Sequence, residues 1–250
     1  MFKYSVHLAA FLAVTVIISV AVANRFFHLP LPSVLSSMLW AKIPVSVGKK
    51  AAPIPVLRVE QVTIGNEKTI SLNQTRQAIG SSVGGRGITP KYPLKEYLMT
   101  WMVSVEDGSL APMQAQVFVP AENTGKQFPI IVYGPGSTGL ADRCAPSLED
   151  LRRGNMGNYR NYMISEASQG YIVVMPNYEG FNNPNRNQHY FNKDNEARSM
   201  LSSVRAILTS GPTANLPMIQ NAIFLGGYSQ GGHAAFSAAD YAETYLPDIR

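Results

Sequence analysis

The chain has 250 residues, 46% of them hydrophobic and 15% charged, and a formal net charge of +5 at pH 7. A chain of this length and composition is most simply one globular domain with a single core. Its Lys and Arg residues are scattered, with only isolated pairs at Lys49–Lys50 and Arg152–Arg153, which excludes a nucleic-acid-binding footprint.

The first 23 residues have the features of an export signal. Lys3 provides a short positive region, Leu8 to Ala23 is uncharged and almost wholly apolar, and Ala21-Val22-Ala23 fits the small-residue cleavage rule. This pattern predicts a secretory signal peptide over residues 1–23. The alternative is an uncleaved membrane anchor, because the apolar run approaches the length of a membrane span and Arg25 follows it. In both cases the folded part is exported: secreted, periplasmic, or anchored to a membrane and facing outward.

Residues 24–55 predict an irregular lead-in, because proline, serine and scattered apolar residues follow one another there without a period. Residues 56–250 form the predicted globular domain. Two strand-like runs, Leu98 to Val105 and Met113 to Val119, flank the turn-forming sequence Glu106-Asp-Gly-Ser109. This arrangement predicts an antiparallel hairpin.

Short apolar runs then alternate with helical patterns. Phe128 to Tyr133 and Tyr171 to Met175 are continuous apolar runs, as in strands that are buried on both faces. One helix is predicted from Tyr159 to Ser168, closed by Gly170, and another from Glu196 to Leu208. The residues expected on their inner faces are Tyr162, Met163, Ile164 and Ala167, and then Ala197, Met200, Leu201, Val204 and Leu208. This order predicts an α/β architecture with a mostly parallel sheet.

The single cysteine, Cys144, excludes an intrachain disulfide, and no cysteine–histidine cluster offers a zinc site. We therefore expect no metal and no cofactor. Cys144 is either buried as a small hydrophobic residue, which is the more common case, or paired with another chain.

The clearest chemical signal lies in Asn221 to Ala235, which predicts a buried strand (Ala222 to Leu225), a glycine-rich turn and a helix. Within the turn, Gly227-Tyr-Ser229-Gln-Gly231 matches G-x-S-x-G. A nucleophile on such a turn has a strained backbone, and small residues two before and two after it let strand and helix approach. Its hydroxyl projects at the positive end of a helix. Ser229 is the predicted nucleophile; the alternative is a serine that only caps the helix.

With the strand order and this turn together, the chain resembles the α/β-hydrolase family, and within it the secretory lipases and related exported serine esterases. Three stretches carry the resemblance: residues 226–235, residues 132–147, and the segment from His189 through the helix at 196–206. The likeness runs from about Tyr97 to the last residue. It implies a serine hydrolase that acts by acyl transfer on a small-molecule or lipid ester, as in lipid catabolism.

The same resemblance implies that Gly134 to Gly139 is the oxyanion loop, although relatives usually have a histidine where this chain has Pro135. The oxyanion donors are backbone N–H groups, which proline lacks. The expected donors are therefore the N–H groups of Ser137 and of Gln230, the residue after the nucleophile. The alternative is that this glycine-rich segment is only a flexible loop.

A general base and an acid should follow the nucleophile in the order Ser, Asp or Glu, His. The only histidine after Ser229 is His233, one helical turn along the same helix, which predicts a packed, hydrogen-bonded histidine instead. His189 lies in an Asn-rich stretch, residues 182–195, that is expected to form a lid or rim. Acidic residues do follow, but without the later strand on which the family carries its acid: Asp240, Glu243 and Asp248. The triad acid and histidine are therefore expected beyond residue 250, in a longer hydrolase of which this chain is the front part, or else the chain is a truncated, inactive product.

Three functions stay open at this level. The first is an exported serine esterase or lipase, and a peptidase on the same fold is close to it in mechanism. The second is a non-catalytic envelope protein that uses a degenerate hydrolase scaffold for binding, motivated by the missing base and acid. The third, a membrane-anchored structural segment, rests only on the N-terminal sequence.

Overall fold

The computed structural model describes residues 57–81, 88–121, 125–149, 157–183, 186–210 and 216–249. They belong to one compact unit that spans Pro53–Arg250. The predictions for residues 1–23 and 24–55 thus fall outside the described residues. Within the described ranges, no helix is both long enough and apolar enough to cross a membrane.

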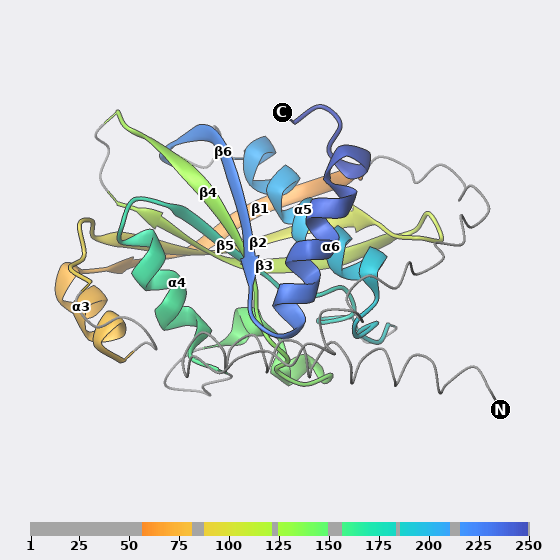
Figure 1. Cartoon of the computed structure of the whole chain (residues 1–250), viewed down its shortest axis with the longest axis horizontal. Coiled ribbons are helices and arrows are strands. Elements are labelled where there is room, and N and C mark those ends of the chain that lie inside the picture. The colour runs from red at the N-terminus through yellow and green to blue at the C-terminus, as the bar shows by residue number, and fades with distance from the viewer. Residues whose placement is uncertain are drawn as a thin grey trace, which may run out of the picture. The chain divides into compact units, whose positions relative to one another are not determined.

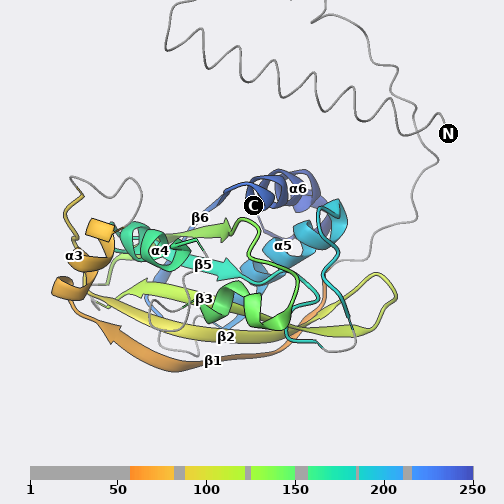
Figure 2. The same ribbon diagram turned by 90° about the horizontal axis from the view of Figure 1, so that it is seen from below.

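The described elements are, in chain order, β1 (Val59–Ile70), α3 (Leu72–Ser81), β2 (Leu94–Ser104), β3 (Leu110–Pro120), β4 (Gln127–Gly134), the 3₁₀ turns η1 (Asp142–Cys144) and η2 (Pro146–Leu148), α4 (Tyr159–Ala167), β5 (Ile172–Pro176), α5 (Lys193–Ser210), β6 (Met218–Gly227) and α6 (Gln230–Tyr245). The strands form one sheet in the order β1-β2-β3-β5-β4-β6 (Figures 1 and 2). The α/β architecture predicted from the sequence is confirmed.

The predicted hairpin is also confirmed. Strands β2 and β3 pair antiparallel with Trp101 opposite Met113. In the turn, Gly108 has a φ of 81°, which favours glycine, and Asp107 accepts hydrogen bonds from the Ser109 hydroxyl and N–H.

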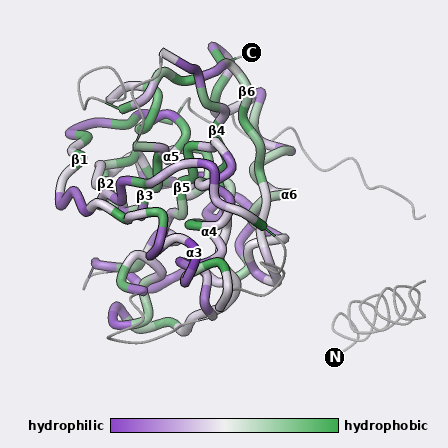
Figure 3. Tube along the Cα trace, turned by 90° about the vertical axis from the view of Figure 1, so that its left-hand side faces the viewer, coloured by the Kyte–Doolittle hydropathy of each residue, from purple (hydrophilic) through white to green (hydrophobic). Residues whose placement is uncertain are grey.

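The prediction of a mostly parallel sheet is wrong. The pairs β1–β2, β2–β3 and β3–β5 are antiparallel, and only β5–β4 and β4–β6 are parallel. Two features cause the difference. The hairpin places β3 directly against β5, and the strand β1, which the sequence pattern did not predict, adds a further antiparallel pair at the edge. Part of β1 is hydrophilic (Figure 3), and its residues Gly65 to Thr69 are all exposed, so a search for apolar runs does not find this strand.

The sheet is buried on both faces, each with its own apolar cluster. All of β5 is buried, and its residues alternate between the clusters, with Val174 in one and Val173 in the other. The larger cluster includes buried residues of α5 and α6, and the smaller one includes residues of α3 and α4. The two helix pairs lie apart from each other in both views (Figures 1 and 2).

The predicted helices are present, with one error in their inner faces. In α5, Ala197, Met200, Leu201 and Val204 are buried as predicted, while Leu208 is half-buried. In α4, however, Tyr162 is exposed, and the buried residue beside it is Asn161. The Asn161 amide donates to the hydroxyl of Ser81 at the end of α3, so part of the inner face of α4 is polar.

Candidate active site

The turn between β6 and α6 holds Ser229 in a conformation that side-chain-bearing residues rarely adopt. Ser229 has a φ of 53° and a ψ of −115°. Such a backbone costs on the order of 1–3 kcal/mol and persists only where the surrounding structure enforces it. Ser229 occupies the N-cap of α6, yet its side chain makes no capping hydrogen bond. The alternative that this serine only caps the helix is therefore wrong.

Glycines enforce the turn because three backbone segments meet there without room for a Cβ. A Cβ at Gly227 or at Gly231 would overlap backbone atoms, of Gly231 in the first case and of Gly134 in the second. Gly134 ends β4, which pairs in parallel with β6 so that Gly134 lies opposite Gly227. The Tyr228 N–H also donates to the Gly134 carbonyl at 3.2 Å. The two glycines of the G-x-S-x-G pattern thus allow the elbow to pack on the end of β4.

The loop after β4 is held by side-chain hydroxyls of the segment between β5 and α5. The Tyr178 hydroxyl, which is buried, donates to the Pro135 carbonyl at 2.6 Å. A Cβ at Gly136 would lie 3.0 Å from the Tyr228 ring. The Ser137 side chain is exposed, and its hydroxyl lies 2.6 Å from that of Tyr190. Pro135 is therefore accommodated through its carbonyl oxygen, and its missing N–H costs the loop none of these contacts.

Burial keeps the Tyr178 hydroxyl protonated. Desolvation raises the pKa of Tyr178 well above its usual value, because the buried phenolate would lose its hydration. The hydroxyl therefore keeps its proton and can donate to the Pro135 carbonyl over the whole physiological pH range. Burial raises the pKa of Tyr133, the residue before Gly134, in the same direction.

Gln230, the other proposed oxyanion donor, is the first residue of α6, where helix N–H groups lack intrahelical partners. Its side chain is buried and donates to Oε1 of Glu196 at 2.9 Å. The other carboxylate oxygen lies 2.5 Å from Nδ1 of His233. The prediction that His233 is a hydrogen-bonded, packed residue is confirmed, and its partner Glu196 is a residue that sequence reasoning missed.

The other histidine considered as a general base, His189, lines a separate cavity. His189 lines a polar cavity of about 400 Å³ together with Glu179, Arg186 and Arg198. Neither histidine in the described ranges, His189 or His233, hydrogen-bonds the Ser229 hydroxyl. In that same part of the chain, no three His, Cys, Asp or Glu residues are grouped as metal ligands.

Three further side chains from the sequence analysis have simple environments. Asp240 and Asp248 form exposed ion pairs with Lys193 and Arg205 respectively. Cys144 is a free, half-buried thiol that packs on the larger apolar cluster, so it is less buried than expected.

Comparisons with known proteins bear on this site. Residues 155–250 match the family described as secretory lipase. A protein named probable inactive lipase from Mycobacterium tuberculosis (strain CDC 1551 / Oshkosh) is 31% identical over 139 residues, which are 53% of this chain and 30% of that protein.

Among solved structures, a protein from Legionella pneumophila has a TM-score of 0.62 and 24% identity, and the match covers 77% of this chain and 49% of that one. A rice cell wall degrading esterase from Xanthomonas oryzae has a TM-score of 0.58 and 18% identity, over 76% of this chain and 47% of the esterase. Candida antarctica lipase A in its closed state has a TM-score of 0.52 and 22% identity, over 74% and 39%. The chain thus spans about half or less of the length of these proteins, and identities this low show the fold alone. Residues 155–250 are thus similar to the secretory lipase family, and the fold of the chain is similar to that of these solved structures, which agrees with the resemblance seen in its sequence.

Proposed function

We propose that this chain carries the nucleophile of an exported serine esterase or lipase, and that Ser229 attacks the carbonyl carbon of an ester. The observation that carries the proposal is the backbone of Ser229, strained at φ 53° and ψ −115° on a strand-to-helix turn and held there by glycines. A helix cap needs no such strain. Similarity to the secretory lipases supports esters as the substrate class and export as the destination.

In the proposed reaction, the Ser229 hydroxyl adds to the ester carbonyl and gives its proton to a general base. The carbonyl oxygen becomes an oxyanion in the tetrahedral intermediate. This intermediate collapses as the protonated base gives its proton to the leaving oxygen, so that the alcohol departs and an acyl-enzyme remains for water to hydrolyse. The N–H groups of Ser137 and Gln230 are the proposed donors to that oxyanion. Removing one such donor typically lowers kcat by about 10²–10³-fold. Neither His189 nor His233 hydrogen-bonds Ser229, so neither is proposed as the general base.

A phosphonate probe tests the proposal directly, because it bonds covalently to an activated serine. The full-length protein, purified from its own cell, should form an adduct that peptide mass spectrometry maps to Ser229. It should also hydrolyse p-nitrophenyl butyrate. The Ser229→Ala variant should do neither while keeping its circular dichroism (CD) spectrum. A folded wild-type protein that neither labels nor hydrolyses the ester would end the proposal.

One observation favours a second candidate, a non-catalytic protein that uses the hydrolase scaffold for binding. The Mycobacterium tuberculosis relative is named a probable inactive lipase. In this case the folded full-length protein hydrolyses no short ester above background, and Ser229→Ala changes no measured activity. Labelling at Ser229 would exclude this candidate.

A further inference from the structure

Glu196 is a buried carboxylate, and its two oxygens contact residues at the start of α6 and in the turn before α5. It has no exposed surface. Its Oε1 accepts from the Phe191 N–H at 3.0 Å and from the Gln230 side chain at 2.9 Å, and its Oε2 pairs with His233 Nδ1. Burying a carboxylate is unfavourable unless hydrogen bonds satisfy it. One carboxylate therefore fixes two residues in the first turns of the helix that follows Ser229.

Tyr190, six residues before Glu196, contacts the loop after β4. The Tyr190 hydroxyl lies 2.6 Å from the Ser137 hydroxyl in the loop after β4. Residues 190–196, which we name the brace, thus contact Ser137 through one end and Gln230 through the other. These are the two residues whose N–H groups are the proposed oxyanion donors.

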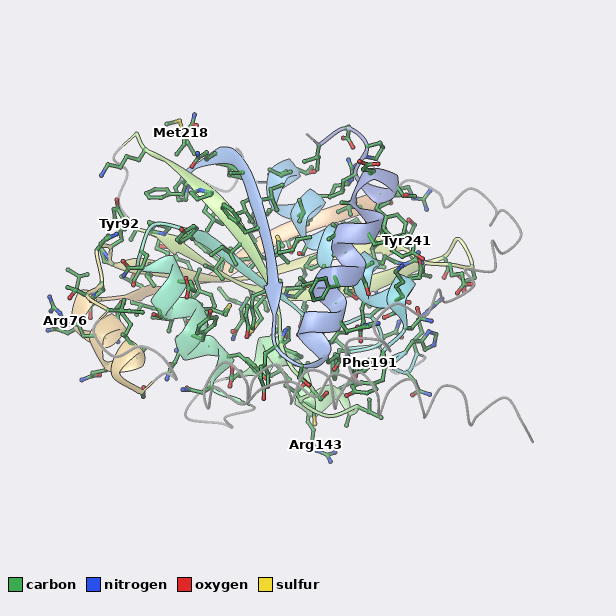
Figure 4. All side chains as sticks on the ribbon, in the orientation of Figure 1. Arg76, Tyr92, Arg143, Phe191, Met218 and Tyr241 are labelled. Carbon is green, nitrogen blue, oxygen red and sulfur yellow. The ribbon has the colours of Figure 1, made fainter. Side chains whose placement is uncertain are left out.

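The backbone of the brace is itself strained. Phe191 has a φ of 56°, a conformation that aromatic residues rarely adopt. The N–H of this residue is the one bound by Glu196, and its ring lies 4.9 Å from the His233 ring. Figure 4 shows Phe191 beside the lower end of α6, where the helix begins. A strained turn that is held on both sides is typical of a functional site.

We infer that Tyr190 and Glu196 are positioning residues, which set the spacing between the Ser137 and Gln230 N–H groups. The inference rests on the proposed function of Ser229. Donors aimed at an oxyanion act on charge that develops only in the transition state. Disturbing the brace should therefore lower kcat and leave KM nearly unchanged.

The test uses Tyr190→Phe and Glu196→Gln in the full-length protein, with p-nitrophenyl butyrate as substrate. Active sites are counted by phosphonate labelling, so that kcat refers to correctly folded molecules. We expect kcat per labelled site to fall about 10-fold for Glu196→Gln and about 3-fold for Tyr190→Phe, less than for loss of a donor itself, with KM within about twofold. Tyr190 is 48% exposed, so removing its hydroxyl should not prevent folding even if Glu196→Gln does.

Two comparisons separate positioning from stability. Glu96→Gln is the matched control, because Glu96 is also a buried carboxylate but pairs with Arg160 on α4. It should lower Tm without changing kcat per labelled site. Ser137→Ala removes only the hydroxyl that meets Tyr190, so the double variant with Tyr190→Phe should lose no more kcat than either single one.

The outcomes are distinct. If wild type labels at Ser229 but both brace variants keep its kcat per labelled site, the brace inference is overturned and the proposed function stands. Additive losses in the double variant would also overturn the role of Tyr190. If wild type does not label at all, the proposed function falls and the inference falls with it.

Discussion

Replacing Gly231 with alanine should force the elbow apart. A Cβ there would overlap the Gly134 carbonyl group and lie 2.9 Å from the Pro135 carbonyl oxygen, where ordinary contacts begin at 3.4 Å. Both obstacles are backbone, so no side chain can rotate away and α6 must move from the end of β4 by more than an ångström. Overpacking costs about 1–3 kcal/mol, and we expect the upper end, about 3 kcal/mol.

Thermal unfolding followed by CD measures this cost. About 1 kcal/mol shifts Tm by about 2–4 °C in a domain of this size, so Gly231→Ala should lower Tm by about 6–12 °C. Gly232→Ala is the matched control, because its Cβ would meet nothing closer than 3.8 Å. Alanine favours the helix there by about 0.5–1 kcal/mol, so this Tm should rise slightly. A Tm for Gly231→Ala equal to that of wild type would refute the close approach of Gly231 to the Gly134 and Pro135 carbonyl groups.

Three further variants test other parts of the structure. Ser229→Gly should relieve the strain at φ 53° and raise stability by about 1 kcal/mol while abolishing phosphonate labelling; a lower Tm would contradict the strain. Tyr178→Phe leaves the Pro135 carbonyl without its donor, so unfolding in urea should show a loss of about 1–3 kcal/mol, and an unchanged midpoint would show that the bond is unimportant. Hydrogen bonds from Ser109 lower the pKa of Asp107 from 3.8 to about 2, so the carboxylate stabilises the fold above pH 3.8 and this contribution is lost as the pH falls through 2. Wild type should therefore have a higher Tm than Asp107→Asn at pH 5 but not near pH 2. The same difference in Tm between the two proteins at both pH values would be inconsistent with this titration.

Features that are set by residues close together in the sequence could be predicted from it. The elbow is specified by a strand, two glycines and a serine within one short stretch, and the structure adds the overlap of Gly231 with Gly134 as the physical reason for the glycines. The β2–β3 hairpin likewise follows from the turn at Asp107 and Gly108. Strand β1 could not be predicted because its burial alternates weakly and many of its residues are exposed.

The brace contacts could not be predicted because they join residues far apart in the chain. No sequence pattern says that Glu196 meets Gln230 and His233. One signal was present: Glu196 precedes Met200 by four residues and Val204 by eight, so it lies on the apolar face of α5. A carboxylate on such a face needs buried partners, and this rule would have marked Glu196 as a residue to examine.

The meeting of glycines at the elbow has a consequence for the order of folding. Gly134 and Gly231 come from distant parts of the chain, whereas the β2–β3 hairpin closes through a short turn. Closing a long loop loses more chain entropy, so we expect the hairpin to form early and the elbow to be completed late. During refolding, the CD signal should therefore return before the phosphonate can label Ser229, and recovery of both in step would contradict this order. The reactivity of one serine would then report the final step by which this chain reaches its native state.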